Sequence, residues 1–148
     1  MKYLSIVLLF VALLTACEKD QTKVDEKIIL DYLEEHGLTA EKHASGLYYQ
    51  TVREGNGIRP DQMSTIQVQY TGYLTDGVVF DEARGEDTLE IQLYNLIQGW
   101  QIGLPLMKNG GNTIFYFPSE MGYGENATGV IPENSVLIFD IELLDSWH

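Results

Sequence analysis

The chain has 148 residues, 45% of them hydrophobic, which is enough for one domain with its own core and too few for two. Nine basic residues against twenty-two acidic ones give a formal net charge of −13 at pH 7. Binding to nucleic acid or to anionic lipid headgroups depends on clustered Lys and Arg, so this charge balance argues against both.

The first sixteen residues are predicted to be an export signal. Met1 and Lys2 precede the apolar run YLSIVLLFVALLTA, which is too short to span a bilayer and is typical of a signal peptide. The run leads into Cys17, the only cysteine, so an intramolecular disulfide is excluded.

The residues LTAC, 14–17, resemble the lipobox of bacterial lipoproteins. That resemblance implies cleavage before Cys17, lipidation of its thiol and acylation of its amine, and more than one acyl chain gives stable anchoring. We therefore expect a location in the cell envelope, anchored on the inner membrane, the outer membrane or the cell surface. The alternative is an ordinary cleaved signal followed by an incidental cysteine.

A helix is predicted over about residues 22–36, after a short charged spacer. Its apolar residues recur at helical spacing: Val24, Ile28, Ile29, Tyr32 and Leu33. Gly37 stands where a C-terminal cap belongs. The apolar stripe is narrow, so the helix is expected to pack either on the domain or on a second copy of itself in a homodimer.

From Gly46 the hydrophobic period changes from 3.6 to 2, which predicts strands with one solvated face. Five runs alternate in this way: 47–52, 65–74, 89–93, 112–117 and 136–144. Asp76 and Gly77 predict a tight turn into VVF. A short helix at about 97–106 separates the third run from the fourth. The expected fold is α+β, a five-stranded antiparallel sheet on one short helix, with an added N-terminal helix.

Trp100 begins the short helix, between Gly99 and Gly103. The glycines are expected to let backbone or ligand approach the indole closely, so that Trp100 forms the floor of a pocket. Apolar residues from separate elements are expected to line a concavity the size of one proline ring: Tyr70, Phe80, Trp100, Tyr123 and Phe139, with Leu96, Ile97, Val130 and Ile131.

The chain carries no Ser/His/Asp order, metal-ligand cluster or phosphate-binding glycine loop, so we expect no metal and no cofactor. Its histidines, His36, His43 and His148, lie outside the aromatic set and are expected at the surface. An aromatic pocket without an acid, a base or a metal suits a reaction in which no bond is made or broken. Rotation about an X-Pro bond is such a reaction.

Five segments resemble, in order and approximate spacing, the FK506-binding-protein (FKBP) type of peptidyl-prolyl cis/trans isomerase: QYTGYL (69–74), DGVVFDEAR (76–84), LIQGWQIGL (96–104), YGENATGVIPENS (123–135) and VLIFDIELL (136–144). The resemblance runs from about residue 46 to residue 147. It implies three segments: a lipoprotein signal at 1–16, a lipidated spacer with the N-terminal helix at 17–45, and an FKBP-type isomerase domain at 46–148.

The resemblance also implies a role for individual residues. Trp100 matches the pocket floor, and Tyr70, Phe80 and Phe139 match walls that meet the substrate carbonyl. Asp81 matches the single acidic pocket residue. The remaining matches are Leu96 and Ile97 for a backbone N–H donor, Tyr123 for a hydroxyl donor, and Val130 and Ile131 for the apolar tip of an overhanging loop.

Two residues depart from the best-known members of the family. Leu89 stands where they have another pocket aromatic, and Ala127 replaces a bulkier residue at the loop tip. Each matched residue also has a structural alternative. Tyr70, Phe139 and Trp100 could be ordinary core, and Asp81 could cap a loop or pair with Arg84.

The function expected from the resemblance is prolyl cis/trans isomerisation in exported or unfolded polypeptides. The alternatives are a non-catalytic chaperone module that binds proline-containing segments, and a lipoprotein whose pocket takes an apolar small molecule.

Overall fold

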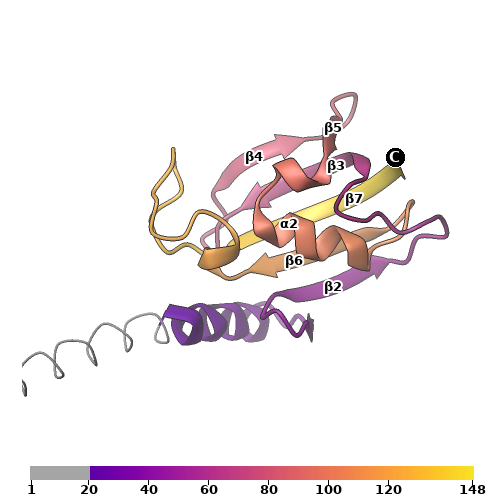
Figure 1. Cartoon of the computed structure of the whole chain (residues 1–148). Helices are drawn as coiled ribbons and strands as arrows, with labels where there is room; N and C mark the ends of the chain where they lie inside the picture. The colour runs from indigo at the N-terminus through magenta and orange to yellow at the C-terminus, as the bar shows by residue number, and fades with distance from the viewer. Residues whose placement is uncertain (1–20) are drawn as a thin grey trace, which may run out of the picture.

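The computed structural model describes residues 21–148, which form a curved antiparallel sheet with a helix against each face (Figure 1). The expected signal at 1–16 and Cys17 lie outside the described residues. The strands are β1 Glu41–Lys42, β2 Tyr48–Arg53, β3 Thr65–Tyr73, β4 Val79–Ala83, β5 Leu89–Gln92, β6 Asn112–Phe117 and β7 Leu137–Trp147. Helix α2, Gln98–Gly103, lies between the 3₁₀ turns η1, Leu93–Asn95, and η2, Leu104–Leu106; a third turn, η3, spans Ser119–Met121.

The strand order is β1-β2-β6-β7-β3-β4, with β5 also paired to β3, and every pairing is antiparallel. The α+β prediction is confirmed, but the sheet has seven strands instead of five. Strand β1 is only two residues long. Strand β4 lies at the edge and is mostly exposed, and its two half-buried residues, Phe80 and Ala83, are three positions apart, so its sequence lacks the alternation that marks the other strands.

The connections also differ from the expected series of hairpins. Strand β2 pairs with β1 and β6 but not with β3, and β7 lies between β6 and β3. Strands β4 and β5 share one edge of β3, where β5 pairs with its first half and β4 with its second half. This arrangement brings Asp81 and Leu89 to the same side of the sheet as the short helix.

Helix α2 packs against the inner face of the sheet, and its glycines explain how closely it does so. A Cβ atom on Gly99 would lie 2.6 Å from the Phe117 ring, and one on Gly103 would lie 2.9 Å from the Phe115 ring. The expectation that these glycines open a path to the indole is therefore wrong, because their bare faces lie against β6. They let the helix seat on the sheet with Trp100 between them.

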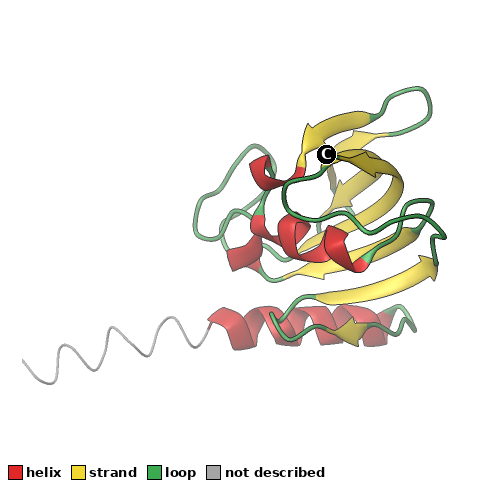
Figure 2. Cartoon of the chain, turned by 45° about the vertical axis from the view of Figure 1, so that its right-hand side comes forward, coloured by secondary structure: helices red, strands yellow, loops and turns green. Residues whose placement is uncertain are grey.

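The N-terminal helix, described over residues 21–35, covers the outer face below β2 and β6 (Figure 2). Ile29 is fully buried and Leu33 nearly so, in a cluster with Tyr48, Tyr116 and Ile138. Of the two packing alternatives, the structure shows the helix on its own domain. The predicted cap is confirmed, because Gly37 has a φ of +63° and the Leu38 N–H donates to the Leu33 carbonyl at 2.8 Å.

One residue of the predicted apolar stripe is misplaced. Val24 is 47% exposed, whereas the neighbouring Asp25 is only 1% exposed. The helix directs Asp25 toward the turn η3, where its carboxylate accepts two hydrogen bonds from Ser119. No helix within residues 21–148 is long and apolar enough to cross a bilayer.

Candidate functional site

A cavity of about 70 Å³ opens between α2, the sheet and the long loop that precedes β7. Eight of the predicted site residues line it: Tyr70, Asp81, Leu89, Leu96, Ile97, Trp100, Tyr123 and Phe139. They come from β3, β4, β5, the start of α2, the loop and β7. The fold thus brings together side chains that the sequence spreads over about seventy positions, in a space suited to one small ring and too small for a secondary-structure element.

Three aromatic rings meet at right angles or steep tilts at the base of this cavity. Trp100 is 3% exposed, and its ring centroid lies 5.1 Å from that of Tyr70 at 90° and 5.3 Å from that of Phe139 at 87°. Tyr70 and Phe139 are 6.2 Å apart. Edge-to-face contacts of this kind are favourable and fix the orientation of each ring. The base is therefore a rigid apolar surface.

The polar side of the cavity is the pair formed by Tyr70 and Asp81. The Tyr70 hydroxyl donates to Asp81 Oδ2 at 2.7 Å. Burial, the hydrogen bond to Asp81 and the charge of that carboxylate raise the pKa of Tyr70 well above its ordinary value. The phenol therefore stays protonated across the neutral range.

Arg84 does not pair with Asp81. Its guanidinium donates to Thr71 Oγ1 at 2.8 Å and pairs with Asp140 at 3.1 Å. The alternative that Asp81 is an ion-pair partner of Arg84 is therefore wrong. Tyr70 lies opposite Ala83 in the β3–β4 register, and Asp81, two residues away, is its diagonal neighbour on the same face. The strand pairing places the carboxylate in the cavity.

Some hydrogen-bond donors of the cavity lining are unused within residues 21–148, among them the Ile97 N–H and the Tyr123 hydroxyl. The Leu96 N–H donates to the Leu93 carbonyl at 3.1 Å, but the Ile97 N–H has no acceptor in the described chain. Ile97 is extended, with φ −57° and ψ 155°, immediately before α2. The Tyr123 hydroxyl also makes no hydrogen bond in the described part of the chain, and its side chain is 39% exposed. Of the two expected backbone donors, the structure leaves only Ile97 available.

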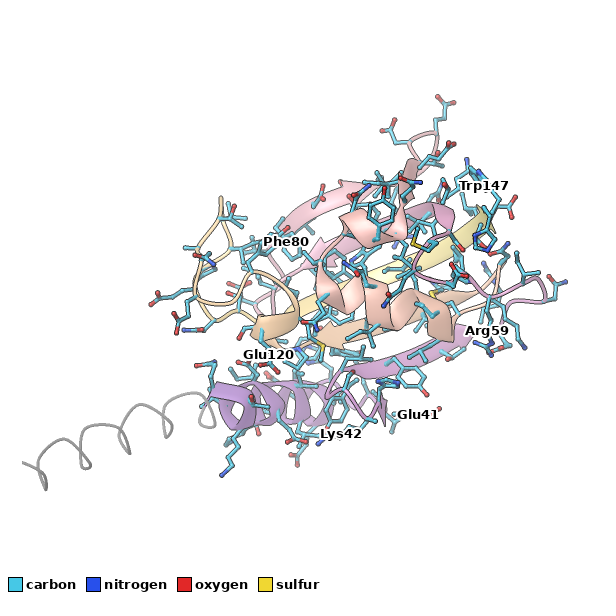
Figure 3. The ribbon with its side chains drawn as sticks, in the orientation of Figure 1. Glu41, Lys42, Arg59, Phe80, Glu120 and Trp147 are labelled. Carbon is cyan, nitrogen blue, oxygen red and sulfur yellow. The ribbon has the colours of Figure 1, made fainter. Side chains whose placement is uncertain are left out.

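Three predicted site residues lie outside the lining of the cavity. Phe80 packs edge-on against Phe139, with ring centroids 5.4 Å apart, and Figure 3 shows it on β4, on the side of the long loop. Ile131 is 5% exposed and belongs to the main core, whereas Val130 is 60% exposed at the loop tip. Phe80 supports the cavity through its contact with Phe139, whereas Ile131 and Val130 are absent from its lining.

Sequence reasoning missed two supporting residues. Phe117 on β6 packs against Phe139, at 5.7 Å between ring centroids. Gly72 on β3 is crossed by the Phe80 and Phe139 rings, which would lie 2.7 and 2.8 Å from an added Cβ. The alternation in 112–117 already directs Phe117 inward, but no pattern in the sequence identifies Gly72 as a point of close approach.

The chemistry open to the cavity is limited by its few ionisable groups. Asp81 is the only carboxylate in its lining, and no His, Lys or Arg is present there. Within residues 21–148, no three His, Cys, Asp or Glu side chains are grouped as a metal site would require. What the cavity offers is an apolar base, one hydrogen-bonded Tyr–Asp pair, and free donors that include the Ile97 N–H and the Tyr123 hydroxyl.

Residues 57–144 match the family described as FKBP-type peptidyl-prolyl cis-trans isomerase. The chain is 45% identical over 102 residues to the FKBP-type peptidyl-prolyl cis-trans isomerase FkpA of Aeromonas hydrophila. That match covers 68% of this chain and 38% of the relative, so the chain spans well under half the length of that protein.

Two solved structures are similar over most of the chain. The crystal structure of FkpA from Escherichia coli has a TM-score of 0.74 at 32% identity and covers 96% of this chain and 70% of that one. A peptidyl-prolyl cis-trans isomerase from Pseudomonas syringae has a TM-score of 0.75 at 26% identity and covers 88% and 96% of the two chains.

Proposed function

The chain belongs to the FKBP-type peptidyl-prolyl cis-trans isomerase family, and from this premise we propose that it accelerates rotation about X-Pro bonds in polypeptides. The cavity above Trp100 is the proposed site. The observation that carries the proposal is the set of three fixed aromatic rings around a space for one small ring. The one carboxylate of the cavity lining, Asp81, already accepts a hydrogen bond from Tyr70.

The chemistry needs no proton transfer. Amide resonance sets a barrier of ~18–20 kcal/mol to rotation, and the planar ground state owes part of its stability to charge separation that water solvates. A proline ring seated on Trp100 removes the imide from water and so disfavours this planar form. A thousandfold acceleration requires about 4 kcal/mol, which desolvation and a few placed donors can supply.

The free donors hold the peptide on either side of the bond that turns. The Ile97 N–H and the Tyr123 hydroxyl are available for substrate carbonyls. The Tyr70–Asp81 pair fixes the wall that faces the substrate carbonyl, because the 2.7 Å hydrogen bond orients the phenol and the carboxylate together. Each group binds or positions, and none exchanges a proton with the substrate.

A protease-coupled assay on a proline peptide tests this function. We expect catalysed isomerisation by the purified protein and a loss of at least tenfold in kcat/KM for Tyr70→Ala, Asp81→Ala or Phe139→Ala. Val52→Ala is the control, since Val52 is 58% exposed on β2 and lies outside the cavity. Peptide binding without acceleration would contradict the enzyme and support a proline-binding chaperone module instead.

We also propose that the substrates are exported or unfolded chains at the cell envelope. The support is in the sequence: the apolar run up to Ala16 and the lipobox-like LTAC that ends at Cys17, followed by a spacer and the N-terminal helix at 17–45 and the isomerase domain from residue 46. Intact mass should show acyl chains on the mature N-terminus. Cys17→Ser should release the protein from the membrane fraction, and an unchanged membrane association in that variant would contradict lipid anchoring.

The homodimer through the N-terminal helix stays a prediction, but the exposed face of the helix would have to form it. The buried face of that helix lies on its own domain, and the exposed apolar residues left on it are Val24 and Leu30, each 47% exposed. Sedimentation of the wild type and of Leu30→Lys tests the prediction. A monomer at all concentrations would contradict it.

A further inference from the structure

The N-terminal helix makes one buried polar contact with the isomerase domain. Asp25 is 1% exposed, and its Oδ2 accepts the Ser119 hydroxyl at 2.6 Å and the Ser119 N–H at 2.8 Å. Its other oxygen accepts from Gln21 Nε2 at 2.7 Å. No Lys or Arg pairs with Asp25 within residues 21–148, so neutral donors alone satisfy this carboxylate. Both donors from the domain belong to Ser119.

Ser119 is the first residue of the segment that carries Tyr123 over the cavity. Its carbonyl accepts from the Gly122 N–H at 3.0 Å and from the Gly124 N–H at 2.8 Å. Tyr123 lies between these two glycines, so two hydrogen bonds to Ser119 fix the backbone on both sides of it. The position of Ser119 therefore sets the position of Tyr123.

The returning limb of the same loop also meets the helix. The Asn134 N–H donates to the Gly124 carbonyl at 2.7 Å and ties the two limbs together. Val136 is buried in the cluster that contains Ile29 and Leu33. Figure 3 shows the turn at Glu120 beside the N-terminal helix. The helix thus holds both ends of the loop.

We propose that Asp25 is a positioning residue for prolyl isomerisation, acting through Ser119 on the placement of Tyr123. The proposal rests on the proposed function of the cavity and extends it to a helix outside residues 57–144, the range that matches the family. Tyr123 is the partly exposed donor of the cavity, so it depends on the loop for its position. The helix that leads from the N-terminal segment is then a working part of the active site.

A double-mutant cycle tests this coupling. Asp25→Ala leaves both Ser119 donors without their buried acceptor and releases the loop. We expect it to lower kcat/KM about tenfold, the order of loss that a small misplacement of a binding group causes. Tyr123→Phe removes the hydroxyl itself. In the Tyr123→Phe background, Asp25→Ala should cost less than about twofold, because coupled residues are not additive.

Two further variants separate positioning from general stability. Glu26→Ala removes a neighbouring carboxylate of the same helix, which accepts from Lys42 and Tyr48 and makes no hydrogen bond to Ser119 within residues 21–148, and should lower the free energy of unfolding while leaving kcat/KM within about twofold. Ser119→Ala removes only the hydroxyl donor and keeps the N–H bond to Asp25, so it is the milder variant if Asp25→Ala does not fold. Asp25→Asn retains an acceptor oxygen and should recover part of the activity.

Hydrogen exchange at the Gly122 and Gly124 amides gives a readout that does not depend on activity. Both amides should exchange at least about tenfold faster in Asp25→Ala and no faster in Glu26→Ala. Unchanged exchange, or an Asp25→Ala effect that is fully additive with Tyr123→Phe, would overturn the proposal. An inactive wild type would instead refute the proposed function, and the exchange rates would still decide whether Asp25 holds the loop.

Discussion

Replacing Gly99 by alanine tests how the fold holds Trp100 in place. The new methyl carbon would lie 2.6 Å from Cγ and Cδ2 of Phe117, whereas ordinary contact begins at 3.4 Å. Helix and ring must therefore separate by about 0.8 Å. Phe117 is fully buried and packs against Phe139, so it has no free space to move into. The helix has to move, and Trp100 is the next residue along it.

The size of the effect follows from two opposing terms. Overpacking of this kind costs about 1–3 kcal/mol, and alanine gains about 1 kcal/mol over glycine within a helix. The free energy of unfolding should therefore fall by up to ~2 kcal/mol. A displacement approaching 1 Å at a binding group costs up to ~100-fold in rate, so kcat/KM should fall at least about tenfold. Urea unfolding measures the first quantity and the proline-peptide assay the second.

Gly103→Ala is the matched control on the same helix. Its Cβ would lie 2.9 Å from Phe115, which requires a smaller shift of about 0.5 Å one turn away from the indole. The helix-propensity gain should offset most of its cost, and kcat/KM should stay within about threefold of wild type. Wild-type stability together with wild-type activity in Gly99→Ala would refute the argument that close packing on β6 positions the floor of the site.

Three other predictions concern single groups. Ile97→Pro should lower kcat/KM about tenfold further than Ile97→Ala. Proline suits a φ of −57° after an extended Leu96, so the substitution removes only the free N–H, and equal activities of the two variants would exclude that N–H as a donor. The pKa of Tyr70 lies above its ordinary value of about 10, so kcat/KM should be level from pH 7 to about 9.5, and a decline centred near pH 8 would contradict a protonated Tyr70. Burial raises the pKa of Tyr116 to about 12, so the folded state holds this proton more tightly, and the associated stability, complete below about pH 10, is lost as the pH rises toward 12. Tyr116→Phe should reduce this alkaline loss of stability. At pH 7 its free energy of unfolding should be unchanged or higher, since the hydroxyl has no partner within residues 21–148, and a loss above about 1 kcal/mol would refute this.

The residues that repeat with a clear period were predictable from the sequence. Alternation identified β3, β6 and β7, and the glycine after the N-terminal helix marked its end. Edge strand β4 was missed because most of it is exposed and its half-buried residues do not alternate, and the strand order was not predictable because register and crossover depend on long-range pairing. Asp25 shows the same limit, since its burial depends on Ser119, 94 residues away in the sequence.

The sequence predicted which residues gather at the candidate site, but not which of them line the cavity, lie in the core or stay exposed. Family motifs brought eight lining residues together correctly in space. They did not separate Ile131, which is core, from Val130, which is exposed, because both are apolar and adjacent. They also did not distinguish the Leu96 N–H from that of Ile97, since only the 3₁₀ turn at Leu93–Asn95 consumes the first of them.

The most direct measurement of the central claim is the cis/trans exchange rate of an X-Pro peptide, followed by NMR with and without the protein. Exchange spectroscopy detects turnover at equilibrium and needs no coupled protease. Uncatalysed exchange takes tens of seconds or more. The account predicts that the wild type raises the exchange rate at least about a thousandfold over the uncatalysed rate, and that Phe139→Ala loses most of this acceleration. A peptide that binds in the cavity yet exchanges at its uncatalysed rate would contradict it.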